Sequence, residues 1–362
     1  MTAVAVDVRR MQDAPLQGVG RYLANTLPLV ARQAELVLLG DARRARPVIA
    51  GLEGVPYVPL PLPARLPEVF WLQWSASRWL RRGQRSDPAT IFHGTFNSAP
   101  RRMTQSLVVN IYDLSFEHHP EDFGAAKRRL FQLQGRDAAR RADRILCPTE
   151  AVRADVLRSY RVEPARVLVS ACAVDPVFHP RLDAEIDEIA VRLGLRRPYV
   201  VGLGGARRRG LPVALGAWRA ANGRARGVDF VAVGGETLPA EPGVHSVGRL
   251  RDADWAAVLA GASAFCYPTR YEGFGMPALE AAASGTPVVC QDLAVLREVL
   301  GPAAEWCVDA SAPAIAAGLS RVLDEPSRRA ELRTLGLARA TAAPTWKDAA
   351  DVVLRAYREA MT

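Results

Sequence analysis

The chain has 362 residues, of which 49% are hydrophobic and 23% charged, and its formal net charge is +9. This length suits two domains, and this composition excludes a disordered or fibrous protein. Five cysteines without metal-ligand spacing, most of them in apolar runs, predict buried and reduced thiols. No apolar run is long enough to cross a membrane, so we expect a cytoplasmic protein.

The positive charge comes almost entirely from arginine, since the only lysines are Lys127 and Lys347. A basic surface suits phosphorylated ligands, anionic membrane surfaces or nucleic acid. The basic residues are scattered and form no recognised nucleic-acid-binding motif, so we expect no nucleic-acid partner.

The first half alternates apolar strands with helical patterns. A strand is expected at residues 3–8, and Gly18-Val19-Gly20-Arg21-Tyr22 begins a helix that runs to about Ala34. Glycines at this point let a ligand approach the backbone. On the motif alone, a plain turn and helix cap is the favoured interpretation.

Two later strands, at residues 90–94 and 107–113, end in polar residues. The first contains His93, and the second ends with Tyr112 and Asp113. Open α/β sheets bind ligands at the carboxyl ends of their strands, which makes these three residues candidates for an acceptor site. A single histidine at a strand end is more often structural than catalytic.

A basic helix is expected at residues 124–141. It suits an anionic membrane surface, but its apolar residues are few, which favours a solvated helix face.

The second half begins with a strand at residues 199–203, followed by glycines and Arg207-Arg208-Arg209-Gly210. A dinucleotide fingerprint would need glycine at position 207 and an acidic residue about 20 positions further on. Neither is present, so we exclude a nicotinamide site.

The stretch from residue 264 to 289 predicts a buried strand, a loop at residues 272–276, a helix from Pro277 and a second strand. The free N–H groups and the positive dipole at the start of a helix form an anion site. Glu272 and Glu280 beside it would accept hydrogen bonds from sugar hydroxyls. A tight turn with two solvated glutamates explains the spacing equally well.

These segments resemble the family-4 retaining glycosyltransferases. Glu272-x7-Glu280, followed by Gly-Thr-Pro-Val-Val at 285–289, resembles the donor-site signature of the family. Further resemblances are found at residues 18–22, 92–93, 107–113, 175–180, 208–211, 244–250, 296–304 and 346–350.

The resemblance implies an α/β fold of GT-B type, in which two doubly wound, Rossmann-like domains with parallel sheets face an inter-domain cleft. We expect an acceptor-side domain at residues 1–180, a linker at 181–197 and a nucleotide-sugar-binding domain at 198–343. The terminal helix, at 344–362, is expected to cross back to the first domain.

The resemblance also implies a set of site residues. Glu280 would hold the ribose diol, and Arg209 would stabilise the leaving diphosphate. The full donor set is Gly20, Arg208, Arg209, Val247, Arg249, Leu250, Glu272, Gly273, Phe274, Gly275, Met276 and Glu280. The catalytic set is Glu272, Arg209, Tyr112, His93 and Asp113. Two of these differ from the family pattern, which has histidine at position 112 and usually lysine at position 209.

The implied activity is a retaining, metal-independent transfer of a hexose, with mannose favoured. The donor would be a sugar of GDP or UDP, used as substrate without a cofactor. The acceptor would be a glycan, a lipid-linked molecule or a small molecule, and contact with the inner face of an anionic membrane fits the basic helix. Asp252-Ala253-Asp254 resembles a helix start and not a metal site. The alternatives are a sugar-nucleotide epimerase or phosphorylase, an inactive scaffold, and a nucleic-acid-binding protein.

Overall fold

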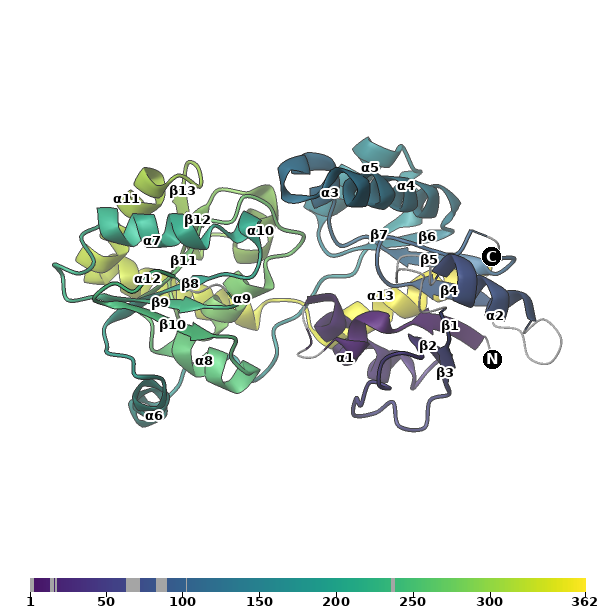
Figure 1. Cartoon of the computed structure of the whole chain (residues 1–362), viewed down its shortest axis with the longest axis horizontal. Coiled ribbons are helices and arrows are strands. Elements are labelled where there is room, and N and C mark those ends of the chain that lie inside the picture. Colours follow the sequence, from purple (N-terminus) through teal and green to yellow (C-terminus); the bar gives the residue numbers. More distant parts are fainter. Residues whose placement is uncertain are drawn as a thin grey trace. The chain divides into compact units, whose positions relative to one another are not determined.

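The computed structural model describes residues 3–13, 16, 18–62, 72–82, 90–101, 103–235 and 238–362. The chain forms two compact units (Figure 1). The first contains the residues up to Ala173 together with Pro344–Thr362, and the second is Val174–Ala343.

The first unit contains a sheet of seven parallel strands in the order β3-β2-β1-β4-β5-β6-β7. Its strands are β1 (Ala3–Asp7), β2 (Glu35–Asp41), β3 (Tyr57–Leu60), β4 (Ile91–Gly94), β5 (Ser106–Asn110), β6 (Arg144–Cys147) and β7 (Val167–Val169). In the register of the central strand, Val4 pairs with Leu36 on one side and with Ile91 on the other. These residues are almost fully buried, as is typical of a parallel sheet that is covered on both faces.

The helices of this unit are α1 (Gly18–Val30), α2 (Ser77–Arg82), α3 (Ser115–His118), α4 (Ala125–Arg141), α5 (Glu150–Tyr160) and α13 (Trp346–Glu359). Helix α13 comes from the end of the chain and lies beside α1 (Figure 1). Thr345 begins α13 through a capping box with Asp348. The rings of Tyr22 and Trp346 meet edge to face, with their centroids 6.1 Å apart.

The second unit contains six parallel strands in the order β10-β9-β8-β11-β12-β13. They are β8 (Tyr199–Leu203), β9 (Asp229–Val233), β10 (Val244–Gly248), β11 (Ala264–Tyr267), β12 (Val288–Gln291) and β13 (Ala304–Cys307). Trp218 lies at the centre of its core, and the indole N–H donates to the carbonyl of Val228 at 2.8 Å. The expected fold class, two parallel-sheet Rossmann-like domains, is confirmed.

The helices of the second unit are α6 (Asp183–Leu193), α7 (Leu211–Ala220), α8 (Asp252–Ala260), α9 (Met276–Ala283), α10 (Ala294–Leu300), α11 (Ala312–Asp324) and α12 (Pro326–Thr341). Helix α6 occupies most of the segment 181–197, which was expected to be a linker. Ile186, Ile189 and Ala190 share one helix face and are buried, and α6 packs against α8. This apolar stripe makes α6 part of the second unit.

In the part of the chain that the structure describes, no helix is both long and apolar enough to cross a bilayer.

Candidate functional site

The order of strands in the second sheet reverses beside β8. The chain runs from β8 to β9 and β10 on one side and then returns to place β11 on the other side of β8. In open α/β sheets, ligands bind at such a switch point, outside the carboxyl ends of the strands. The loops after β8 and β11, residues 204–210 and 268–275, therefore form the candidate site of this unit.

Backbone contacts join these two loops. The N–H of Arg270 donates to the carbonyl of Arg208 at 2.9 Å. Gly210 has φ +69°, and a Cβ at this position would lie 2.7 Å from the carbonyl oxygen of Pro268. Only glycine fits both this conformation and this approach. The three-arginine turn is thereby held against the loop that carries Glu272.

Replacing Gly210 with alanine is expected to destabilise the fold by about 2–3 kcal/mol and to weaken donor binding, because the two loops must separate. Gly227 provides a matched control, since it has the same φ of +69° with no atom within 4 Å of a Cβ. Gly227→Ala carries only the conformational cost, about 1 kcal/mol. Equal losses in urea unfolding of the two variants would show that the contact with Pro268 is unimportant.

Glu272 is buried and is an acceptor within its own loop. The hydroxyl of Tyr267 donates to Glu272 Oε1 at 2.5 Å, and the hydroxyl of Thr269 lies 3.3 Å from the same oxygen. Burial raises the pKa of Tyr267 well above its usual value, the charge of Glu272 raises it further, and Arg209 opposes the shift. The phenol of Tyr267 therefore stays protonated and orients the carboxylate of Glu272. The positive charge of Arg209 is close enough to act on this phenol.

Glu280 lies in α9, and its side chain is almost fully buried. The indole N–H of Trp255, in α8, donates to Glu280 Oε2 at 2.9 Å. This hydrogen bond fixes the carboxylate beside the start of α9, where Gly275 adopts φ +85° as the N-cap residue. A Cβ on Gly275 would lie 2.5 Å from Leu296 Cδ2, so the turn into the helix requires glycine.

The guanidinium of Arg209 contains a buried N–H group that donates to no described residue. Its Nη1 donates to the carbonyl of Gly204 at 3.1 Å, whereas its Nε is buried and has no partner among the described residues. A buried guanidinium N–H without a partner is costly, and an anion in the loop would satisfy it. Arg208, in the same turn, is half-buried.

The remaining donor candidates lie around these loops. Gly273 and Met276 are half-buried, and Phe274 is buried with 8% exposure. Val247, Arg249 and Leu250 lie at the carboxyl end of β10, which is the edge strand of the sheet.

The acidic pair at the start of α8 has structural partners. Asp254 pairs with Arg192 and, at 3.2 Å, with Arg251. Asp252 lies in the same first helical turn. This placement agrees with the helix start expected from the sequence.

In the first unit, the structure places His93 inside the fold. The ring is fully buried; Nε2 lies 2.5 Å from the amide oxygen of Asn110, and Nδ1 lies 2.7 Å from the hydroxyl of Tyr357 in α13. Nε2 therefore carries the proton and Nδ1 accepts from Tyr357. Both ring nitrogens are used internally, which corrects the expectation that His93 faces an acceptor.

Burial lowers the pKa of His93 to about 4, and the hydrogen bond that Asn110 accepts from the ring opposes this shift. Unfolded chains protonate histidine near pH 6.5, so between pH 6.5 and 4 the unfolded state binds more protons. This residue alone is expected to lower the free energy of unfolding by roughly 3 kcal/mol as the pH falls across that window. NMR of the ring nitrogens at pH 5.5 should show a neutral imidazole, with the exposed His179 as the comparison. A titration of His93 near pH 6.5 would refute the buried network.

Tyr112 and Asp113 differ in the hydrogen bonds of their side chains. The ring of Tyr112 packs edge to face on Tyr22 at 5.6 Å, and its hydroxyl is buried with no partner in the described parts of the chain. Desolvation by burial raises the pKa of Tyr112 well above its usual value, so the hydroxyl stays neutral. Asp113 Oδ1 accepts from both the N–H and the hydroxyl of Ser115, the first residue of α3, at 2.9 and 2.6 Å.

Close packing within the first unit explains why residue 20 is glycine. A Cβ at this position would lie 2.5 Å from the carbonyl oxygen of Arg10, whereas one on Gly18 would meet nothing within 4 Å. The close approach is between α1 and the chain that follows β1, so this glycine is required by the fold of the first unit.

The residues that sequence analysis missed are the ones that hold the carboxylates. Tyr267 and Thr269 orient Glu272, and Trp255 orients Glu280. Tyr267 and Thr269 lie within five positions of Glu272, but nothing in their spacing indicates a hydrogen bond. Trp255 is 25 positions from its partner, and no local pattern marks it.

Two family models match the chain, one in each half. The model described as Glycosyltransferase Family 4 matches residues 16–178, and the model described as Glycosyl transferases group 1 matches residues 197–325.

Similar proteins agree with these matches. The chain is 27% identical over 292 residues to O-antigen chain mannosyltransferase B of Escherichia coli, a match that covers 74% of each chain. It is 40% identical over 134 residues to MMP alpha-(1->4)-mannosyltransferase of Mycolicibacterium hassiacum, which covers 35% of this chain and only 32% of that relative. The crystal structure of Anabaena HepE in complex with UDP-glucose superposes with a TM-score of 0.74 at 14% identity, covering 99% of this chain and 100% of the other.

The two family matches, together with the two parallel-sheet units, identify a glycosyltransferase of GT-B type. The chain belongs to the family-4, group-1 glycosyltransferases. The resemblance stated from the sequence is thereby confirmed.

Proposed function

We propose that this protein transfers a hexose, with mannose favoured, from a nucleoside-diphosphate sugar to an acceptor hydroxyl. One observation carries the proposal. At the switch point of the second sheet, the buried Nε of Arg209 has no partner among the described residues, beside the loop that begins α9 and carries Glu272. A diphosphate would satisfy this N–H and would be attracted by the positive dipole at the start of α9.

The roles of the residues follow from their chemistry. Glu280 accepts hydrogen bonds from the ribose diol, and Glu272 accepts from hydroxyls of the donor sugar. Arg209 and the start of α9 stabilise the negative charge that grows on the diphosphate as the bond to the anomeric carbon breaks. The acceptor oxygen bonds to that carbon from the same face and its proton passes to the departing diphosphate. The anomeric configuration is thereby retained, and no metal is needed to balance the charge.

The similar proteins support the sugar and the donor class. Two relatives carry mannosyltransferase names, and HepE was crystallised with UDP-glucose. GDP and UDP sugars are therefore the donors to test first. Glycans, lipid-linked molecules and small molecules are the acceptor classes.

The test is a transfer assay with a panel of GDP, UDP, ADP and TDP sugars, each with and without acceptors of the three classes. Release of one nucleoside diphosphate that depends on acceptor, together with a product whose anomeric configuration matches the donor by NMR, supports the proposal. Activity should persist in EDTA. Interconversion of the sugar nucleotide without acceptor would indicate an epimerase, and release dependent on inorganic phosphate a phosphorylase. Binding of no nucleotide at all would remove the central claim.

We also propose that α4 contacts an anionic membrane surface. This helix carries Lys127, Arg128 and Arg129 in its first half, and Leu133 is 47% exposed although it is apolar. Basic residues beside an exposed apolar side chain suit a surface of anionic lipids. Sedimentation with vesicles that contain phosphatidylglycerol, but not with neutral vesicles, is the expected result.

A further inference from the structure

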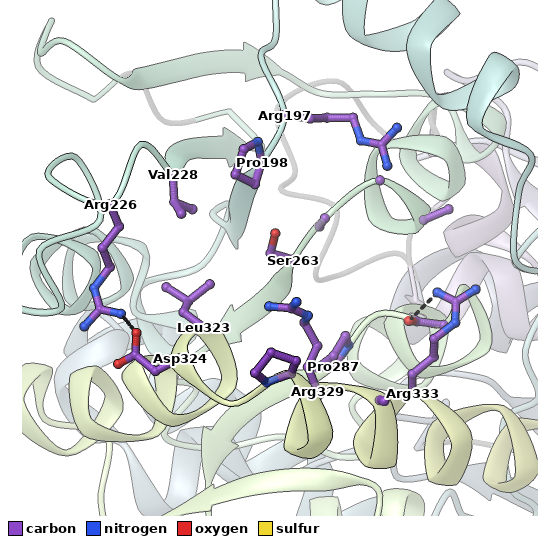
Figure 2. A pocket seen from close by; sticks show the side chains of 16 residues that line it. Arg197, Pro198, Arg226, Val228, Ser263, Pro287, Leu323, Asp324, Arg329 and Arg333 are labelled. Carbon is purple, nitrogen blue, oxygen red and sulfur yellow. Dashed lines mark hydrogen bonds and ion pairs between the residues drawn. The ribbon is translucent and has the colours of Figure 1, made fainter.

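A pocket lies in the second unit at the amino ends of its strands, opposite the carboxyl ends where the candidate site lies (Figure 2). The pocket has a volume of about 870 Å³ and is lined by residues that immediately precede strands, among them Pro198, Ser263 and Pro287. Since the strands are parallel, these residues mark the amino edge of the sheet. The four residues of β11, roughly 13 Å of extended chain, separate Ser263 from the loop that carries Glu272.

The lining of this pocket is strongly basic. Four arginines, Arg197, Arg226, Arg329 and Arg333, face a single acidic residue, Asp324. Side chains of opposite charge normally balance in a pocket that binds nothing, because unpaired like charges repel each other. Two carboxylates of α6 outside the lining pair with Arg197, and the four arginines still outnumber these acidic groups and Asp324 by one, which favours an anionic ligand.

Three of these arginines have partners in the protein. Arg226 pairs with Asp324, and Arg333 Nη1 donates to the carbonyl of Gly285 at 3.1 Å. Arg197 pairs with two acidic residues of α6, at 3.0 and 3.2 Å. These contacts fix the arginines around the rim and leave part of each guanidinium available, since each carries five N–H donors.

Arg329 is different. Its side chain is half-buried, and within the described residues its guanidinium makes no hydrogen bond or ion pair. Figure 2 shows it rising from α12 toward Ser263 at the middle of the pocket. The hydroxyl of Ser263 likewise has no partner in the described chain. Helix α12 begins at Pro326, so its positive end also lies at the pocket.

We propose that this pocket binds a phosphorylated metabolite, whose phosphate is held by Arg329 and Ser263. Guanidinium groups bind phosphate with two parallel hydrogen bonds, and a helix start adds to the attraction. The volume exceeds that of a phosphate ion, and Pro198, Val228 and Leu323 provide an apolar wall for an organic part.

The pocket is connected with the donor loops through two elements. Ser263 precedes β11, which leads to the loop of Glu272, and Gly285 follows α9, which begins in that loop. A ligand that orders the residues around Ser263 and Gly285 therefore acts on one end of β11 and of α9. The opposite ends of these two elements carry the donor loop. The inference stands independently of the transfer reaction, because it uses none of the donor residues.

Inorganic pyrophosphate is the first probe, used with the full-length protein in calorimetry and in hydrogen–deuterium exchange. We expect protection of residues 260–263 and 323–333. Arg329→Gln is expected to weaken this binding about tenfold or more, because a charged hydrogen-bond partner is lost. Arg339→Gln, ten positions further along the same helix, is expected to leave it unchanged.

Pyrophosphate is also expected to bind at the donor loops, where a diphosphate would lie. The variant Arg209→Gln distinguishes binding at those loops from binding in the pocket. This variant should keep the protection at 260–263 and 323–333 and lose any at 204–210 and 272–276. Arg329→Gln should unfold at the same temperature as the natural protein, since the side chain has no partner to lose. Protection confined to the donor loops, equal affinity of Arg329→Gln and the natural protein, or no binding at all would overturn the inference.

Discussion

Replacing Glu280 with glutamine is expected to remove half or more of the stabilisation that a nucleoside diphosphate gives this protein. Glutamine keeps an oxygen that accepts from the indole of Trp255, now 2.9 Å from the carboxylate, so the fold is retained. It loses the charge and the second acceptor that the ribose diol needs, and hydrogen bonds to charged groups contribute about 1.5–3 kcal/mol. Donor affinity should fall about 10- to 100-fold.

A thermal-shift titration measures this loss. A ligand at 100 times its dissociation constant stabilises a fold by about 2.7 kcal/mol, and a tenfold loss of affinity at the same concentration reduces this to about 1.4 kcal/mol. Glu241→Gln is the matched control, because it removes a glutamate charge from the exposed pair with Arg219 in the same unit. If Glu280→Gln and Glu241→Gln respond to nucleotide equally, Glu280 does not hold the ribose.

Arg209→Gln is expected to lower kcat/KM by about 10²–10³, the usual cost of removing one donor that stabilises a developing negative charge. The buried Nε of Arg209 lacks a partner among the described residues, and its Nη1 is fixed on the carbonyl of Gly204, so the guanidinium is oriented before the donor binds. Such preorganised charge acts mainly on the transition state, where the diphosphate departs. The loss should therefore appear in kcat in addition to the weaker binding of the diphosphate group.

Two further variants sharpen this test. Arg207→Gln changes an exposed arginine of the same turn and should leave kcat near that of the natural protein. Arg209→Lys restores the positive charge that the family usually has here and should recover part of the loss, although lysine lacks the two-point contact of arginine. Equal activity of Arg209→Gln and Arg207→Gln would show that Arg209 has no part in transfer.

The fold could be predicted from the sequence because its signals are local. Apolar runs such as residues 264–267 are buried on both faces of a parallel sheet, and the glycine and proline at 275 and 277 begin a helix where they were expected to. The same local chemistry made Glu272 and Glu280 candidates, whereas the role of Arg209 was implied only by the resemblance to the family. Helix α6 was missed because a short helix with a narrow apolar stripe resembles a polar connection.

The state of each candidate side chain could not be predicted. His93 ends a strand as an active-site histidine would, yet the last helix, more than 250 positions further on, supplies Tyr357 and closes over it. Gly20 looks like a glycine that admits a ligand, yet its neighbour is the carbonyl of Arg10. In both cases the deciding contact comes from another element.

The amino-acid sequence alone was enough to predict two parallel α/β domains, membership of the family-4 glycosyltransferases and the loops that carry the charged groups. These properties depend on periodicity, glycine and proline positions and short spacings, which act within one strand, turn or helix. Three features became visible only in the folded chain: Trp255 holds Glu280, His93 is internal, and four arginines meet at the amino ends of the second sheet. Hydrogen bonds and burial between distant segments exist only after the chain has folded, and no local pattern encodes them.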